Sequence, residues 1–248
     1  MKTIRVLILI ATLLLVVCLS GLVTLAILPP APTFTEKPDI PVNTPSVEDV
    51  ILPLTEDAGQ EYIDKIYFVG ESTTSHFYKG GISDSHILVP ESKTMTLGSD
   101  ILKISVGSEG LTIPEAVKKA NAEILIITLG VNNASNFKEN QYKYFYGNLI
   151  RAIQKESPNT KIIIQSIFPV TKNYSDNSTI ITNDAIDRNN KWGKELAFEY
   201  GLRYLDTQSI LKDESGGLIE KYCNDEGIHL EAEAYTEIIY YIRTHAIE

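Results

Sequence analysis

Short apolar runs alternate with segments of helical spacing from about residue 60 to the end of the chain. The apolar runs are typical of strands and lie at residues 65–69, 101–106, 124–129, 161–168 and 202–205. The run at 124–129 is almost wholly apolar, as expected of a central parallel strand covered on both faces. Helical spacing marks residues 114–122, 141–155, 183–200 and 231–244. This alternation predicts an α/β domain with a mostly parallel five-stranded sheet.

A long uncharged segment stands near the N-terminus. Residues 6–28 contain no charged side chain and follow Lys2 and Arg5. As a helix the segment would be about 35 Å long, enough to cross a bilayer core of about 30 Å. The preceding positive charges would place the rest of the chain outside. We therefore expect residues 1–28 to form a cytoplasmic tip and an uncleaved signal-anchor transmembrane helix.

Two other fates of this segment are open. A cleaved signal peptide would leave a secreted protein, but its apolar region is usually only about 7–15 residues long. Cys18 could be a lipoprotein cysteine, but the bulky Val17 before it fits that processing poorly. Residues 29–58 carry prolines, threonines and scattered acids without periodicity, which predicts an extended spacer. The folded domain is then expected at 59–248.

Composition excludes several classes of function. The formal net charge is −10 and no lysine or arginine cluster offsets it, so nucleic-acid binding is not expected. The two cysteines, Cys18 and Cys223, cannot build a disulfide framework. No CxxC motif or Cys/His cluster with metal-ligand spacing is present, so the sequence gives no indication of a metal site.

Residues suited to acyl transfer follow the predicted strands or precede the last helix. In a parallel α/β sheet, ligands bind at the carboxyl ends of the strands. The segments there read GES (70–72), GSEGLT (107–112), GVNN (130–133) and DEGIHL (225–230). A serine nucleophile needs a base, a carboxylate that orients the base, and donors for the oxyanion.

These segments contain each of those parts. Ser72 is the candidate nucleophile and His229 the candidate base, oriented by Glu226 or Asp225. The backbone N–H groups of Ser72 and Gly110 and the side-chain amide of Asn132 are the candidate oxyanion donors. Taken singly, each residue is more simply a turn, capping or packing residue, so the prediction depends on their joint order.

That order resembles the SGNH hydrolases, also called the GDSL esterase/lipase superfamily. The family's Gly-Asp-Ser, Gly, Gly-x-Asn-Asp and Asp-x-x-His blocks are matched over roughly residues 62–247. The resemblance implies a flavodoxin-like three-layer α/β/α sandwich and a serine esterase without a cofactor. It also implies the roles of nucleophile for Ser72, of base for His229, and of oxyanion donors for Gly110 and Asn132. Gly110 is preferred to Gly107 because GSEGLT then aligns with a family-like GxxGxT.

Three positions depart from the family pattern. Glu71, Asn133 and Glu226 stand where the family usually has aspartate. A glutamate keeps the charge but is one methylene longer, so Glu226 must hold the imidazole from a different distance, and Asp225 is the alternative. Glu71 lies in a tight turn, where the longer side chain could move the amide of Ser72.

Together with the expected outer location, the resemblance implies hydrolysis of small acyl esters, acetyl in particular, on extracellular or cell-envelope carbohydrates. Two alternatives remain: a catalytically weak glycan-binding module on the same fold, and a glycan O-acyltransferase. The segment 171–182 is polar and is expected to be a loop near the mouth of the site. The aromatic segment 142–146 could stack on sugars, although core packing is its simpler interpretation. The sequence does not indicate an oligomeric state.

Overall fold

The computed structural model describes residues 45–224 and 226–247, and its central element is a five-stranded parallel sheet. The strands are β1 (Ile66–Gly70), β2 (Ile87–Leu88), β5 (Ile124–Thr128), β6 (Lys161–Gln165) and β7 (Arg203–Leu205). Their order across the sheet is β2-β1-β5-β6-β7, and all four pairings are parallel. This is the flavodoxin-like order. Strand β2 is added on one side of β1, and the later strands β5, β6 and β7 are added on the other side, so the strand order reverses between β1 and β5. The expected flavodoxin-like fold with a five-stranded parallel sheet is confirmed for the described residues.

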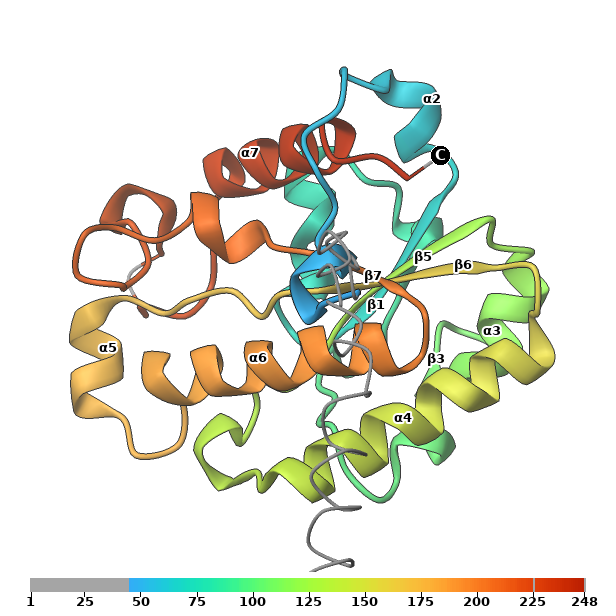
Figure 1. Ribbon diagram of the computed structural model, residues 1–248, viewed down its shortest axis with the longest axis horizontal. Helices are drawn as coiled ribbons and strands as arrows, with labels where there is room; N and C mark the ends of the chain where they lie inside the picture. Colours follow the sequence, from blue (N-terminus) through green and yellow to red (C-terminus); the bar gives the residue numbers. More distant parts are fainter. Residues whose placement is uncertain (1–44, 225, 248) are drawn as a thin grey trace, which may run out of the picture. The chain divides into compact units, whose positions relative to one another are not determined.

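Helices cover both faces of the sheet (Figure 1). One face carries α2 (Gly59–Ile63) and α7 (Ala232–Arg243), and the other carries α3 (Ile113–Ala120), α4 (Glu139–Glu156) and α6 (Asn183–Glu199). An apolar core lies on each face of the sheet. Alternate residues of each strand pack into one core or the other, because side chains in a strand point to opposite faces. In β5, Ile124 and Ile126 pack toward α7, whereas Leu125 and Ile127 pack toward α4. The three layers therefore follow from strands that are apolar on both faces.

The aromatic segment of α4 belongs mainly to the core. Tyr142 and Tyr146 are almost fully buried, and their hydroxyls donate to the carbonyls of Leu129 and Ile127. Tyr144 is 62% exposed on the outer side of the helix. Core packing is thus the role of the two buried tyrosines.

The predicted strand at 101–106 is wrong. Residues Ile101–Lys103 form a short 3₁₀ helix, and β3 (Ser105–Val106) pairs antiparallel with β4 (Leu111–Thr112) in a separate two-stranded sheet. The edge strand of the main sheet is instead β2, whose two residues are too few to give a sequence pattern. A turn over 107–110 closes the β3–β4 hairpin, and the positive φ of Gly107 and Gly110 permits it.

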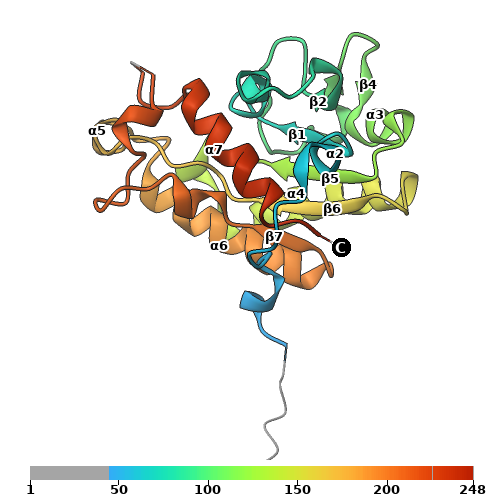
Figure 2. The same ribbon diagram turned by 90° about the horizontal axis from the view of Figure 1, so that it is seen from above.

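The compact unit begins at Pro45, earlier than the expected boundary at residue 59. Val50 and Leu52 are buried, and the backbone N–H of Leu52 donates to the carbonyl of Tyr204 at 2.9 Å. Ile51 forms a parallel bridge to Tyr204 in β7. The last part of the predicted spacer is therefore built into the domain, and Figure 2 shows it beside β7.

The predicted signal anchor lies outside the described residues, as do the first sixteen residues of the spacer, 29–44, and Asp225. Within residues 45–224 and 226–247, no helix combines the length and apolar character needed to cross a bilayer.

Candidate active site

The candidate nucleophile follows β1, on a turn that depends on a glycine. A Cβ on Gly70 would lie 1.9 Å from Oγ1 of Thr74 and 2.5 Å from the carbonyl oxygen of Thr128, so only glycine fits. The chain then turns into a 3₁₀ helix, Thr74–Gly80. The hydroxyl of Tyr235 on α7 donates to the carbonyl of Thr73 at 2.6 Å and fixes the turn from the other side. Ser72 is left half-buried at the carboxyl end of the sheet.

The structure brings Ser72, His229 and Glu226 together. Nε2 of His229 lies 3.3 Å from Oγ of Ser72, and its Nδ1 lies 3.1 Å from Oε2 of Glu226. With the proton on Nδ1, the imidazole donates to the carboxylate and accepts from the serine hydroxyl. The side chain of Glu226 is 69% exposed and that of His229 is 25% exposed. The three side chains lie in the order nucleophile, base and orienting acid. The hydrogen bond between Ser72 and His229 is long, as is common before a substrate binds.

The loop that carries His229 is held against the nucleophile turn. Nζ of Lys79, at the end of the 3₁₀ helix, donates to the carbonyl of Leu230 at 2.9 Å. The same ammonium lies 3.8 Å from the carboxylate of Glu231. The two segments of the site, which are about 150 residues apart in sequence, are therefore tied together directly beside the histidine.

Asn132 follows β5 and lies beside the segment 95–97. Its side-chain amide donates to the carbonyl of Met95 at 2.7 Å. An amide carries two N–H donors, so the second remains for a substrate oxygen. The backbone N–H of Ser72 donates to none of the residues described in the chain. Both groups are therefore suited to the oxyanion role expected from the sequence.

Gly110 is placed differently from the other candidates. It is exposed in the β3–β4 turn, and its backbone N–H donates to the carbonyl of Gly107 at 3.4 Å. The interactions of the described chain do not connect it with Ser72, His229 or Asn132. The residue after β2 that contacts Asn132 is Met95, which the sequence pattern did not single out. The geometry thus gives no support to Gly110 as an oxyanion donor.

Glu71 is fully buried and holds the loop after β5. Its Oε2 accepts the backbone N–H groups of Gly130, Val131 and Asn132, at 3.1, 2.6 and 3.1 Å. Desolvation by burial raises the pKa of Glu71 to about 7, and these three backbone donors, together with that of Leu97, oppose the rise. The extra methylene of glutamate therefore lets one carboxylate span the gap between the nucleophile turn and the loop of Asn132.

The loop after β5 is also held from α6. The side-chain amide of Asn189 is fully buried and donates to the carbonyls of Gly130 and Ala134, each at 3.2 Å. Asn133, which replaces the family's aspartate, has φ +61°, a left-handed conformation that asparagine tolerates well. Glu71 and Asn189 thus bind the N–H and C=O groups of the same loop.

A second histidine, missed in the sequence, packs against the first. The ring of His76 meets that of His229 edge-to-face, with the centroids 5.2 Å apart. Burial lowers the pKa of His76, and the nearby His229 lowers it further. The pattern around residue 76 is that of a solvated loop, so only the fold could reveal this contact.

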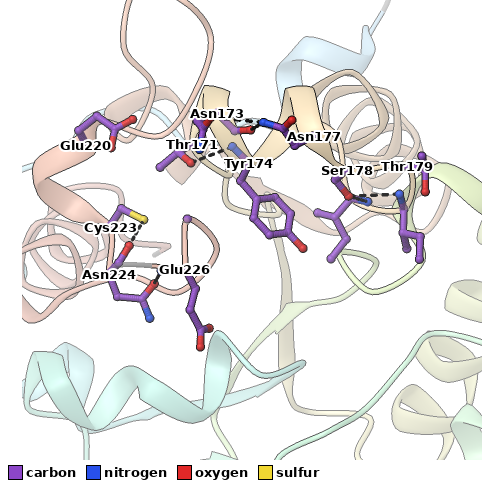
Figure 3. A pocket seen from close by; sticks show the side chains of 13 residues that line it. Thr171, Asn173, Tyr174, Asn177, Ser178, Thr179, Glu220, Cys223, Asn224 and Glu226 are labelled. Carbon is purple, nitrogen blue, oxygen red and sulfur yellow. Dashed lines mark hydrogen bonds between the residues drawn. The ribbon is translucent and has the colours of Figure 1, made fainter.

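A polar pocket of about 740 Å³ opens beside the acid of the site (Figure 3). It lies between the loop 223–227 and the segment 171–181, which contains the short helix α5 (Lys172–Asn177) rather than the loop expected there. Within residues 45–224 and 226–247, no three His, Cys, Asp or Glu side chains form a group that could hold a metal ion.

A family model of GDSL-like lipases/acylhydrolases matches residues 96–236, more than half of the chain. The chain therefore belongs to the GDSL-like lipase/acylhydrolase family, and it is an SGNH-type esterase, as the order of its four sequence blocks predicts. The match includes Asn132, Glu226 and His229 and begins after Ser72, so the evidence for Ser72 is its geometry. No curated protein sequence matches the chain.

Solved structures share the fold at low sequence identity. The acetyl xylan esterase AlAXEase is 13% identical, with a TM-score of 0.54 over 73% of this chain and 99% of that one. A protein proposed to be a platelet activating factor from Streptococcus pneumonia is 18% identical, with a TM-score of 0.53 over 79% and 94%. A proposed lipolytic protein of the G-D-S-L family from Desulfitobacterium hafniense is 16% identical, with a TM-score of 0.51 over 73% and 98%.

Proposed function

We propose that the protein removes small acyl groups, acetyl in particular, from carbohydrates at the outer face of a cell membrane, to which residues 6–28 anchor it. The observation that carries the proposal is the chain of contacts from Ser72 through His229 to Glu226, beside a polar pocket. A polar pocket suits a carbohydrate and does not suit a long acyl chain. The fold also occurs in an acetyl xylan esterase.

The reaction follows from the positions of the three side chains. Oγ of Ser72 attacks the ester carbonyl while Nε2 of His229 takes the hydroxyl proton. The carboxylate of Glu226 accepts a hydrogen bond from Nδ1–H of His229 and stabilises the imidazolium that forms. The oxyanion accepts hydrogen bonds from the backbone N–H of Ser72 and the amide of Asn132.

Collapse of the intermediate releases the sugar hydroxyl, which takes its proton from His229. The acyl group stays on Ser72 as an ester. A water molecule, deprotonated by the same histidine, then attacks that ester and frees the carboxylic acid and the serine. Water is the acceptor in this scheme, which separates hydrolysis from transfer to a second glycan.

An acetate-release assay tests the activity. The full-length chain, solubilised in detergent, is incubated with acetylated xylan, acetylated cell-wall glycan and p-nitrophenyl acetate. We expect release of acetate from at least one glycan, and a loss of about 10⁴-fold or more in kcat for Ser72→Ala. Turnover of p-nitrophenyl acetate without release from any glycan would contradict the carbohydrate assignment.

The location needs a separate test. Cells that produce the full-length chain are treated with a protease that does not cross the membrane, and the domain is followed with an antibody. Digestion in intact cells is the expected result. Protection until the cells are broken would contradict an outer location.

A further inference from the structure

The pocket beside Glu226, here called the α5 pocket, is joined to the catalytic loop through the backbone. The N–H of Thr171 donates to the carbonyl of Gly227 at 2.9 Å, directly beside the candidate acid. Glu226 and Gly227 line the pocket themselves. A group bound there would therefore lie next to the acid that orients His229.

The lining of the α5 pocket is polar but carries no cationic side chain among the residues described. Side-chain amides, hydroxyls and two carboxylates supply the polar groups, and Tyr174 supplies an aromatic ring. Lys172 and Lys221 adjoin lining residues, but they pair with Asp176 at 2.7 Å and Glu233 at 2.6 Å. Phosphate, sulfate and carboxylate ligands would have no positive partner in this pocket.

Two carboxylates give the pocket a negative field. Glu220 and Glu226 both line it, and the whole chain carries a net charge of −10. Like charges at short range in a partly enclosed site repel. An anionic ligand is therefore disfavoured twice, since it lacks a cation to pair with and meets two negative groups.

Tyr174 and the opposite wall suit a ring with polar edges. The Tyr174 side chain projects between the Glu226 side of the pocket and the Ser178 and Thr179 side (Figure 3). The hydroxyls of Tyr174 and Thr179 make no hydrogen bond within the described chain, so both are available to a ligand. Ile180 and Ile181 add apolar surface to the wall. An aromatic ring, apolar carbons and unpaired hydroxyls together match a pyranose, which has apolar C–H groups and a rim of hydroxyls.

We propose that the α5 pocket is a subsite for an uncharged sugar residue of the substrate, and that it makes the enzyme selective for acyl esters of neutral glycans over those of anionic glycans. The inference rests on the proposed function and adds to it the charge class of the glycan and the residues that recognise it.

The first test compares substrates that share an acetyl group and differ in the alcohol. The full-length chain is assayed on acetylated xylo-oligosaccharide, acetylated oligogalacturonate and p-nitrophenyl acetate. We expect kcat/KM for the neutral oligosaccharide to exceed that for the anionic one by at least tenfold. Equal values, or a preference for the anionic substrate, would overturn the inference.

The second test removes the tyrosine ring. Tyr174→Ala keeps the Cβ that faces Gly227 and removes the surface offered to a sugar. We expect kcat/KM for the neutral oligosaccharide to fall at least tenfold, mainly through KM, while that for p-nitrophenyl acetate stays within twofold. Tyr144→Ala, which removes an exposed tyrosine on α4, is the matched control and should change neither.

The third test reverses a charge at an exposed position, so folding is not at stake. Glu220→Lys should reduce the ratio of neutral to anionic kcat/KM about fivefold at low salt, and added salt should bring the ratios of the variant and the wild type closer together. Glu214→Lys, an exposed glutamate that does not line the pocket, is the control.

The outcomes separate the two proposals. If the wild type is active on glycans, an unchanged kcat/KM for the neutral oligosaccharide in Tyr174→Ala and an unchanged selectivity in Glu220→Lys would overturn the α5 pocket as a subsite and leave the carbohydrate esterase standing. Absence of activity on every glycan, with turnover of p-nitrophenyl acetate, would overturn both.

Discussion

Glu71 is where a departure from the family pattern acquires a physical explanation. An aspartate would be one methylene shorter, and here the longer acid reaches three successive backbone N–H groups of the loop that presents Asn132. Burial raises the pKa of the Tyr142 and Tyr146 phenols, and the nearby carboxyl of Glu71 adds to the rise. Glu71 itself is 1% exposed, so its carboxyl is withdrawn from solvent.

The raised pKa of Glu71 makes stability depend on pH. The pKa of Glu71 is about 7 in the folded chain, whereas the ordinary value for a glutamate, which applies to the unfolded chain, is 4.5. The folded form therefore keeps its proton between these values while the unfolded form loses it. The contribution of Glu71 to the free energy of unfolding is fully present below pH 4.5. It falls by about 3 kcal/mol as the pH rises through 7.

Glu71→Gln isolates this effect because the amide does not titrate but its oxygen can still accept hydrogen bonds. We expect the difference in unfolding free energy between Glu71→Gln and wild type to move in favour of the variant by about 3 kcal/mol between pH 4 and pH 8. Urea unfolding at several pH values measures it. A difference that stays constant with pH would contradict the buried-acid account.

At the scale of elements, α5 and the loop 223–227 are packed so closely that one glycine is required. Gly227 has φ +87°, and a Cβ there would lie 2.7 Å from Oγ1 of Thr171 and 2.8 Å from Cβ of Tyr174. The contact links the helix that lines the pocket with the residue next to the candidate acid.

Gly227→Ala should therefore push the acid away from His229. We expect a loss of at least tenfold in kcat, together with a destabilisation of about 1–3 kcal/mol from the left-handed backbone and the clash. Gly216→Ala is the matched control, because its φ is +78° but a Cβ there meets nothing within 4 Å. If both variants lose activity equally, the close contact at Gly227 is not what positions the acid.

The sequence predicts most elements because their apolar patterns are long. Strands β1, β5, β6 and β7 and helices α3, α4, α6 and α7 lie within a few residues of the predicted positions. The two-residue β2 leaves no pattern, and the apolar run 101–106 forms a 3₁₀ helix and a short hairpin strand instead.

The candidate site is predictable only in part. The order of residues at strand ends suggests Ser72, Asn132 and His229, because parallel strands deliver their carboxyl ends to one edge. The contacts of Glu71, Asn189 and His76 join residues far apart in sequence, so no local pattern contains them.

At the scale of the whole molecule, the domain includes part of the segment expected to be a spacer. Leu52 is 4% exposed and packs in the core beneath α7, whereas Leu54, two residues later, is 76% exposed. Leu52→Ala should lower the unfolding free energy by about 2–5 kcal/mol.

Leu54→Ala is the control for this change and should stay within about 0.5 kcal/mol of wild type. Chemical unfolding of the full-length variants measures both. If residues 45–58 were a detached spacer, the two substitutions would behave alike.

The central claim is that Ser72, oriented by its contact with His229, is the nucleophile of the esterase. Treatment of the full-length chain with a fluorophosphonate, followed by peptide mass spectrometry, tests it most directly. We predict a single adduct on Ser72, lost in Ser72→Ala and slowed at least a hundredfold in His229→Ala. An adduct on another residue, or esterase activity that persists in Ser72→Ala, would contradict the account.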